Sequence, residues 1–203
     1  MRRHLDAALR AAQRVAHAGA LSGGLLILAA ALLVSVDVTL RKLANTTLGG
    51  ADELSGYALA IGSTWSFAFV LLARGHVRID ALYQVLPRKL AAACDLIAIV
   101  ALLAFASLIA WHGAGTLAQS WHLGARSNSS LAVPLAVPQA LWWIGYLGFV
   151  ICAVLLLARA LAAMWAGDLA AANRLIGARS IEEEAADELA NALAARGATK
   201  ASA

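Results

Sequence analysis

Four long stretches almost free of charge constrain this chain more than any other feature. Residues 18–36 and 54–73 contain no Asp, Glu, Lys or Arg, and further apolar runs occupy 96–110 and 139–158. Each is close to the roughly 20 helical residues that cross a bilayer core of about 30 Å. Long uninterrupted runs favour helices over barrel strands, which would alternate apolar and polar residues. The sequence therefore predicts an all-α integral membrane protein with four transmembrane helices.

The two ends of the chain differ in kind from its middle. Residues 2–17 mix arginine with leucine and alanine at helical spacing, as expected for an amphipathic segment on a membrane surface. Near the other end, Ser180 and Glu183 form a capping-box pattern that predicts a short exposed helix. We therefore expect amphipathic cytoplasmic segments at both ends. The predicted divisions are an N-terminal segment at 1–17, a membrane domain at 18–165 with spans at about 18–40, 53–73, 90–112 and 138–158, and a C-terminal helix and tail at 166–203.

Basic residues set the expected orientation. The chain has 203 residues, of which 62% are hydrophobic, and it carries a formal charge of +4. With the N-terminus inside, only Arg41, Lys42 and Arg126 of its 16 Lys and Arg residues fall outside. This asymmetry satisfies the positive-inside rule and accounts for the charge without a nucleic-acid partner. We expect a multi-pass protein of the bacterial inner membrane with both termini cytoplasmic, and the first apolar run, longer than that of a signal peptide, to be retained.

Motifs for chemistry are missing from the sequence. It contains no HExxH, GxSxG, P-loop or dinucleotide-binding glycine pattern. Cys94 and Cys152 lie in or beside apolar runs without CxxC spacing, which argues against a zinc site or a disulfide. Haem ligation needs histidines inside a bundle, but His112 and His122 are ten residues apart and off a common helical face. We therefore predict no enzyme activity, no catalytic residue, no cofactor and no metal.

Two acidic residues near membrane depth are candidates for function, because charges are expensive there. Asp37 stands four residues before Arg41, which predicts a local ion pair near a helix end. Asp95 lies a few residues after Arg88 and Lys89, and a structural role is again favoured.

Small side chains recur every four residues in the second apolar run. Such a stripe lets membrane helices approach closely, and the neighbour can be another helix of the bundle or a partner protein. The stripe consists of Gly56, Ala60, Thr64 and Ala68.

The connection between the second and third runs has a distinctive composition. Gly75 permits a turn, Asp80 can pair with Arg78 or Arg74, and Pro87 can open the next helix. Basic side chains at such a place can also hold anionic lipid headgroups. We call this set the cytoplasmic loop motif: Arg74, Gly75, His76, Arg78, Asp80 and Pro87.

In this order, these features resemble the small permease subunit, or Q subunit, of the tripartite ATP-independent periplasmic (TRAP) transporters, the DctQ-like family. The resemblance rests on Arg41 after the first run, Asp52 and Glu53 opening the second, the cytoplasmic loop motif, and residues 127–138 before the fourth run. It covers about residues 21–158.

The resemblance implies a non-catalytic scaffold with defined partners. In this family a periplasmic binding protein delivers an organic acid, and a large (M) subunit carries it with sodium by an elevator movement. The small subunit accompanies the large one and contacts membrane lipids. The resemblance makes Arg41, Asp52 and Glu53 candidates for partner contact or helix anchoring, although Glu53 can equally be a favourable charge at a helix start.

Other classes of membrane protein stay open on the residues alone. They are a membrane-anchor or cytochrome-type subunit of an electron-transfer complex, a small homo-oligomeric transporter or channel, and an assembly factor. The small-residue stripe does not separate them, because every helix bundle needs close packing. The substrate, ion stoichiometry and subunit ratio are not encoded in any motif of this sequence.

Overall fold

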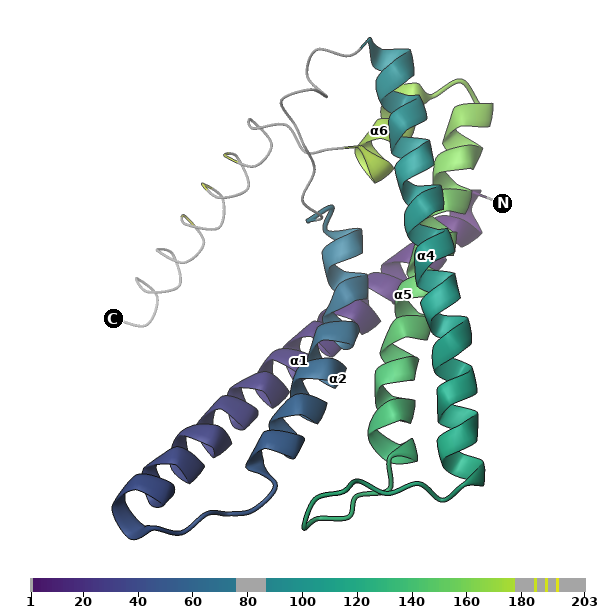
Figure 1. Cartoon of the computed structure of the whole chain (residues 1–203). Coiled ribbons are helices and arrows are strands. Elements are labelled where there is room, and N and C mark those ends of the chain that lie inside the picture. Colours follow the sequence, from purple (N-terminus) through teal and green to yellow (C-terminus); the bar gives the residue numbers. More distant parts are fainter. Residues whose placement is uncertain (1, 76–86, 178–184, 186–188, 190–192, 194–203) are drawn as a thin grey trace.

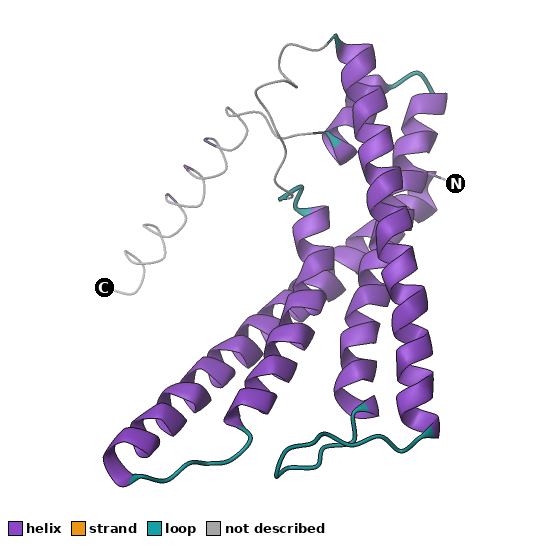
Figure 2. Cartoon of the chain, in the orientation of Figure 1, coloured by secondary structure: helices purple, strands orange, loops and turns teal. Residues whose placement is uncertain are grey.

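A computed structural model describes residues 2–75, 87–177, 185, 189 and 193 of the chain. Every regular element in this part is a helix (Figure 2). The helices are α1 (Arg2–Ala44), α2 (Ala51–Leu72), α4 (Arg88–His122), α5 (Ala136–Trp165) and α6 (Leu169–Ile176). The four long helices are apolar enough to cross a membrane, which confirms the predicted all-helical fold with four spans.

The long helices form two antiparallel hairpins (Figure 1). Residues 45–50 join α1 to α2, and residues 123–135 join α4 to α5. Helix α2 packs on both α1 and α5, so it connects the hairpins, while α5 also packs on α4 and α6. We call the end with the two connections the loop end. The opposite end, with Arg10, Arg14, Arg74 and α6, is the basic end.

Helix α1 is longer than the span predicted at 18–40. The N-terminal segment that was predicted to be amphipathic runs directly into the apolar part of one helix of 43 residues. No proline interrupts residues 2–44. Leu9 and Ala16 are buried against the bundle, so this first part of α1 is held by packing as well as by its backbone.

Helix α6 follows a tight turn after α5 and was not predicted. The Asp168 carboxylate accepts a hydrogen bond from the Ala171 amide at 2.9 Å, which caps the helix start. Ala172 and Ile176 are buried. The helix that the capping-box pattern predicts near residue 180 lies almost wholly outside the described residues.

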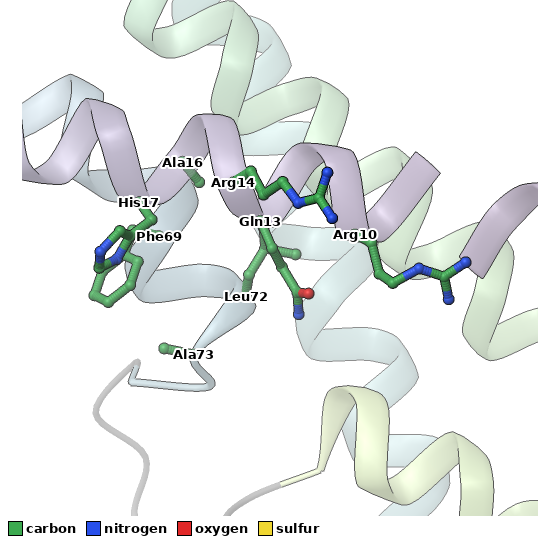
Figure 3. Close-up of a pocket in the computed structure, with 8 residues that line it drawn as sticks. All are labelled: Arg10, Gln13, Arg14, Ala16, His17, Phe69, Leu72 and Ala73. Carbon is green, nitrogen blue, oxygen red and sulfur yellow. The ribbon is translucent and has the colours of Figure 1, made fainter. Parts of the chain in front are cut away.

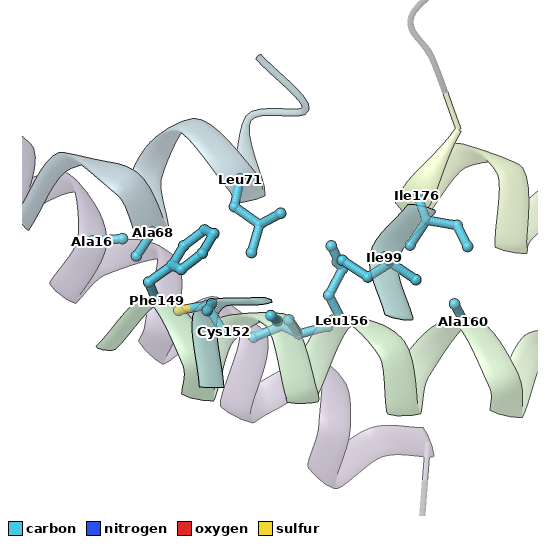
Figure 4. Close-up of a cluster of buried hydrophobic side chains, with 12 residues drawn as sticks. Ala16, Ala68, Leu71, Ile99, Phe149, Cys152, Leu156, Ala160 and Ile176 are labelled. Carbon is cyan, nitrogen blue, oxygen red and sulfur yellow. The ribbon is translucent and has the colours of Figure 1, made fainter. Parts of the chain in front are cut away.

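The buried apolar core extends from the middle of the bundle to the basic end (Figure 4). All five helices contribute to it, and its alanines allow the helix backbones to approach closely. Phe149 packs edge-on against Phe67, with ring centroids 5.9 Å apart. The core residues are Leu9, Ala16, Ala68, Leu71, Ile99, Ala106, Phe149, Cys152, Ala153, Leu156, Ala160 and Ile176.

Candidate functional site

At the loop end, Asp37 organises the connection between α1 and α2. One of its carboxylate oxygens accepts hydrogen bonds from the Thr47 hydroxyl and the Leu48 amide, both at 2.7 Å. The other pairs with Arg41 at 2.6 Å, which confirms the predicted ion pair. Asp37 is 2% exposed, whereas the Arg41 side chain is 59% exposed. The carboxylate therefore holds the loop in place and leaves the guanidinium accessible.

Glu53 joins the start of α2 to the loop between α4 and α5. It lies in the first turn of α2 and accepts hydrogen bonds from the Tyr57 hydroxyl, at 2.5 Å, and from the Ser129 hydroxyl of the other loop. Ser129 is 76 residues away in the chain. Asp52, its neighbour, is exposed. Of the three candidate contact residues, Glu53 and Arg41 are both bonded within the chain, while Arg41 also stays exposed, as Asp52 does.

The loop between α4 and α5 has a defined shape of its own. The Arg126 guanidinium donates to the Ala132 carbonyl at 3.0 Å, and the Val133 amide donates to the Ser127 hydroxyl at 3.0 Å. Leu131, at its tip, packs against Gly50, which has φ 85°. A side chain at Gly50 would be strained and would collide with Leu131. The two loops therefore form one surface.

The helices α1 and α2 touch most closely at two glycines. A Cβ atom built on Gly23 would lie 2.7 Å from the Gly62 carbonyl oxygen, and one on Gly62 would lie 2.7 Å from that of Gly23. Gly145 of α5 meets Thr64 in the same way, at 2.6 Å from the threonine hydroxyl. Close contact of this kind is typical of small residues between membrane helices.

Two members of the predicted stripe are buried in the chain and two are exposed. Thr64 is buried against α5, and Ala68 is buried in the core. Gly56 and Ala60 are exposed, and a Cβ on Gly56 would meet nothing within 4 Å. Sequence spacing did not single out Gly62, which lies off the stripe.

Tryptophan side chains join neighbouring helices through hydrogen bonds. The Trp65 indole N–H of α2 donates to the Leu141 carbonyl of α5 at 2.9 Å. The Trp143 indole of α5 donates to the Ala110 carbonyl of α4 at 2.8 Å. These carbonyls lie in helices, and each indole finds the partner that a half-buried donor requires.

At the basic end, the described part of the cytoplasmic loop motif ends one helix and starts another. Arg74, with φ 56°, and Gly75 close α2, and the Gly75 amide donates to the Val70 carbonyl at 2.9 Å. Pro87 stands at the N-cap of α4. The other members of the motif, His76, Arg78 and Asp80, lie outside the described residues.

Metal-binding and redox groups are scattered in the part of the chain that the structure describes. No three His, Cys, Asp or Glu residues there come together as metal ligands. His112 and His122 are exposed on α4, Cys94 is an exposed free thiol and Cys152 a buried one. Asp95 is buried near the start of α4.

These features define a small helical membrane protein with a loop end ordered by carboxylates and an apolar core toward the basic end. The model of one protein family, described as "Tripartite ATP-independent periplasmic transporters, DctQ component", matches residues 30–164. This range is more than half of the chain and reaches from α1 to the end of α5. The chain therefore belongs to the DctQ component family of TRAP transporters, as the sequence resemblance predicted, and it is a non-catalytic permease component. Searches of curated proteins and of solved structures found no match.

Proposed function

We propose that the chain is the scaffold of the large (M) permease subunit in a sodium-driven TRAP transporter, and that a periplasmic binding protein delivers an organic acid to this complex. The family match across the four spans carries the proposal. The charged side chains of the described residues lie toward the two ends of the helices. The middle of the bundle thus offers packing surface rather than a polar substrate site, as suits a scaffold.

The proposed orientation puts the loop end outside and the basic end in the cytoplasm, with both termini inside the cell. The positive-inside rule supports it, since 13 of the 16 Lys and Arg residues then lie on the cytoplasmic side. The segment 1–17 would lie at the inner surface. Its amphipathic character is supported by the burial of Leu9 and Ala16 and by the exposure of Arg10 and Arg14.

The contact with the large subunit is proposed for the exposed half of the stripe, at Gly56 and Ala60. A groove of about 220 Å³ lies beside it, lined by residues of α2 and α5 that include Tyr57, Gln139 and Trp142. The side-chain amide oxygen of Gln139, Oε1, is buried and has no hydrogen-bond partner within the described part of the chain. A partner helix that brings a small apolar surface and one donor would fill this region.

The loop end is the proposed contact for the binding protein. Asp52 and Arg41 are accessible there, and Glu53 fixes the surface on which they lie by joining α2 to the other loop. The cytoplasmic loop motif is assigned to topology and to contacts with lipids or the large subunit.

Co-purification tests this function most directly. With a tag at its C-terminus, the chain extracted in mild detergent should bring a large multi-spanning permease at near-equal amount. Gly56→Leu should reduce that amount, whereas Gly24→Leu, also an exposed glycine with open space around it, should not. In vesicles, uptake should require this chain, the permease, the binding protein and a sodium gradient together.

Other results would favour the competing functions. A haem absorption spectrum of the purified protein would indicate an electron-transfer subunit, and uptake by vesicles that contain this chain alone would indicate an independent carrier. Orientation has its own test. Ser130→Cys should react with an impermeant maleimide in intact cells, and Ala166→Cys only after the membrane is opened, both in a background without Cys94 and Cys152.

A further inference from the structure

A pocket of about 450 Å³ lies between the first part of α1 and the end of α2 (Figure 3). His17 lies beside Phe69 at one end of it, with ring centroids 5.6 Å apart, and Arg10 marks the other end. The wall from α1 is polar and basic, and the surface from α2 is apolar. The lining residues are Arg10, Gln13, Arg14, Ala16, His17, Phe69, Leu72 and Ala73.

Among the described residues, no carboxylate neutralises the positive charge of this pocket. Arg10 and Arg14 are one helical turn apart and exposed, and neither forms an ion pair with a carboxylate among the described residues. Asp6, the acidic residue on the same part of α1, is instead paired with Arg159 of α5 at 2.6 Å. Two guanidinium groups are thus available, and their planar forks of N–H donors match the oxygens of a phosphate. The Gln13 amide adds further donors.

The pocket lies where both of its walls change from apolar to basic. On α1 the uncharged stretch 18–36 begins directly after His17, and on α2 the uncharged stretch 54–73 ends at Ala73, directly before Arg74. A charge-free stretch marks the hydrocarbon depth of a bilayer, and charged groups beside it reach the headgroup layer. Phe69 and Leu72 therefore face the level of the first methylene groups, and the arginines face the level of the phosphates.

We propose that this pocket binds the phosphodiester headgroup of an anionic phospholipid, with Arg10 and Arg14 on the phosphate and the upper acyl chain against Phe69 and Leu72. In the orientation proposed above, on which the choice of leaflet rests, this lipid comes from the cytoplasmic leaflet. Basic pockets between membrane helices on that side bind anionic headgroups in the same way. A zwitterionic headgroup is disfavoured, because its own cation competes for the phosphate and is repelled by the arginines.

Native mass spectrometry of the full-length protein tests the proposal. The purified and delipidated chain would be titrated with phosphatidylglycerol and, separately, with phosphatidylcholine of the same acyl chains. We expect phosphatidylglycerol to bind about thirtyfold more tightly, because each of the two basic groups contributes about 1 kcal/mol and about 1.4 kcal/mol corresponds to a factor of ten. The double variant Arg10→Gln/Arg14→Gln should lose this preference. Lys42→Gln, which removes a positive charge from the loop end of the same helix, should keep it.

Two outcomes would overturn the proposal. One is an unchanged preference in the glutamine double variant. The other is displacement of bound phosphatidylglycerol by millimolar inorganic phosphate, which would assign the pocket to a soluble phosphate compound. The variant Arg10→Lys/Arg14→Lys keeps both charges and should retain most of the preference. That result would show that the loss in the glutamine double variant is caused by the missing charges and not by misfolding. Lipid binding in detergent does not depend on the orientation of the protein in the membrane. A wrong orientation would therefore change the result of the cysteine labelling and not that of the lipid titration.

Discussion

The loop end and the basic end are ordered by different interactions. At the loop end, carboxylates hold the chain: Asp37 accepts from Thr47 and Leu48, and Glu53 accepts from Ser129 of the other loop. Toward the basic end, a cluster of buried apolar side chains from five helices holds the structure. A loop too short to bury a core keeps its shape through hydrogen bonds from side chains to backbone. Packed helix ends depend less on such bonds: Asp6 pairs with Arg159 there, while Arg10 and Arg14 have no ion pair among the described residues.

One small protein can thus present two kinds of surface. Hydrogen bonds are directional, so those of the loop end fix the shape of its surface. At the basic end, buried apolar packing holds the helices, so Arg10 and Arg14 are not needed for ion pairs among the described residues. Each end can therefore be weakened separately.

The contact of α1 with α2 supports both ends, so breaking it should have the largest effect. Gly23→Leu would place a side chain against the Gly62 backbone, where even a Cβ lies 2.7 Å from the carbonyl oxygen. We expect a loss of about 3 kcal/mol of stability, since overpacking at a site that cannot relax is costly. Thermal unfolding in detergent, followed by circular dichroism, measures it. Gly24→Leu, one residue on with open space around it, is the control, and equal melting of both variants would contradict the close contact.

Removing apolar volume should weaken the basic end in particular. Leu156 is buried in the core, and Leu156→Ala should cost about 2 kcal/mol through lost packing and the cavity left behind. Leu161→Ala removes the same atoms from an exposed position on the same helix and should cost little. Urea unfolding curves of the two variants give the difference. If they coincide, the core does not hold this end.

Neutralising Asp37 should weaken the loop end. Asp37→Asn replaces the carboxylate that pairs with Arg41 and accepts from Thr47 and Leu48, so the connection 45–50 should loosen. We expect a fall of about 5 °C in the melting temperature, given that about 1 kcal/mol corresponds to 2–4 °C in a chain of this size. Limited proteolysis should then cut within residues 45–50. Asp52→Asn changes an exposed carboxylate nearby and should leave both readouts as they are.

Separating the two loops should have the smallest effect on stability. Ser129→Ala removes the hydroxyl that donates to Glu53 but leaves the hydrogen bond from Tyr57. Hydrogen–deuterium exchange should become faster for amides of residues 127–135 and stay unchanged around Leu9 and Ala16. The melting temperature should fall by about 2 °C. Faster exchange at both ends would mean that the ends are not independent.

The sequence predicted the membrane helices well because the length of their apolar runs is set by the thickness of the bilayer. A helix that crosses a bilayer needs about 20 apolar residues, so a span can be predicted without knowledge of its tertiary contacts. Helix ends leave a weaker trace in the sequence. Helix α4 continues to His122, beyond the segment 90–112 expected for the third span, through residues such as Gln119, which lowers the hydropathy yet forms helices readily.

Local pairs were predictable and distant ones were not. The ion pair of Asp37 with Arg41 follows from a spacing of four on one helix. The bond from Ser129 to Glu53 joins residues 76 apart, so nothing in the spacing indicates it. Likewise, glycine spacing marks positions where helices can meet but not where they do: Gly62 meets Gly23, while Gly56 faces open space.

The unbroken length of α1 has a mechanical consequence. Its 43 residues extend about 64 Å at 1.5 Å per residue, roughly twice the thickness of a bilayer core. The close contact of Gly23 with Gly62 lies near its middle. By the geometry of a stiff rod, a change of about 10° in tilt about this point would displace each tip by about 6 Å, in opposite directions. Leu9 and Ala16 pack into the core on one side of the contact, and Asp37 is bonded to Thr47 and Leu48 on the other, so such a tilt would have to break contacts at both ends of the bundle.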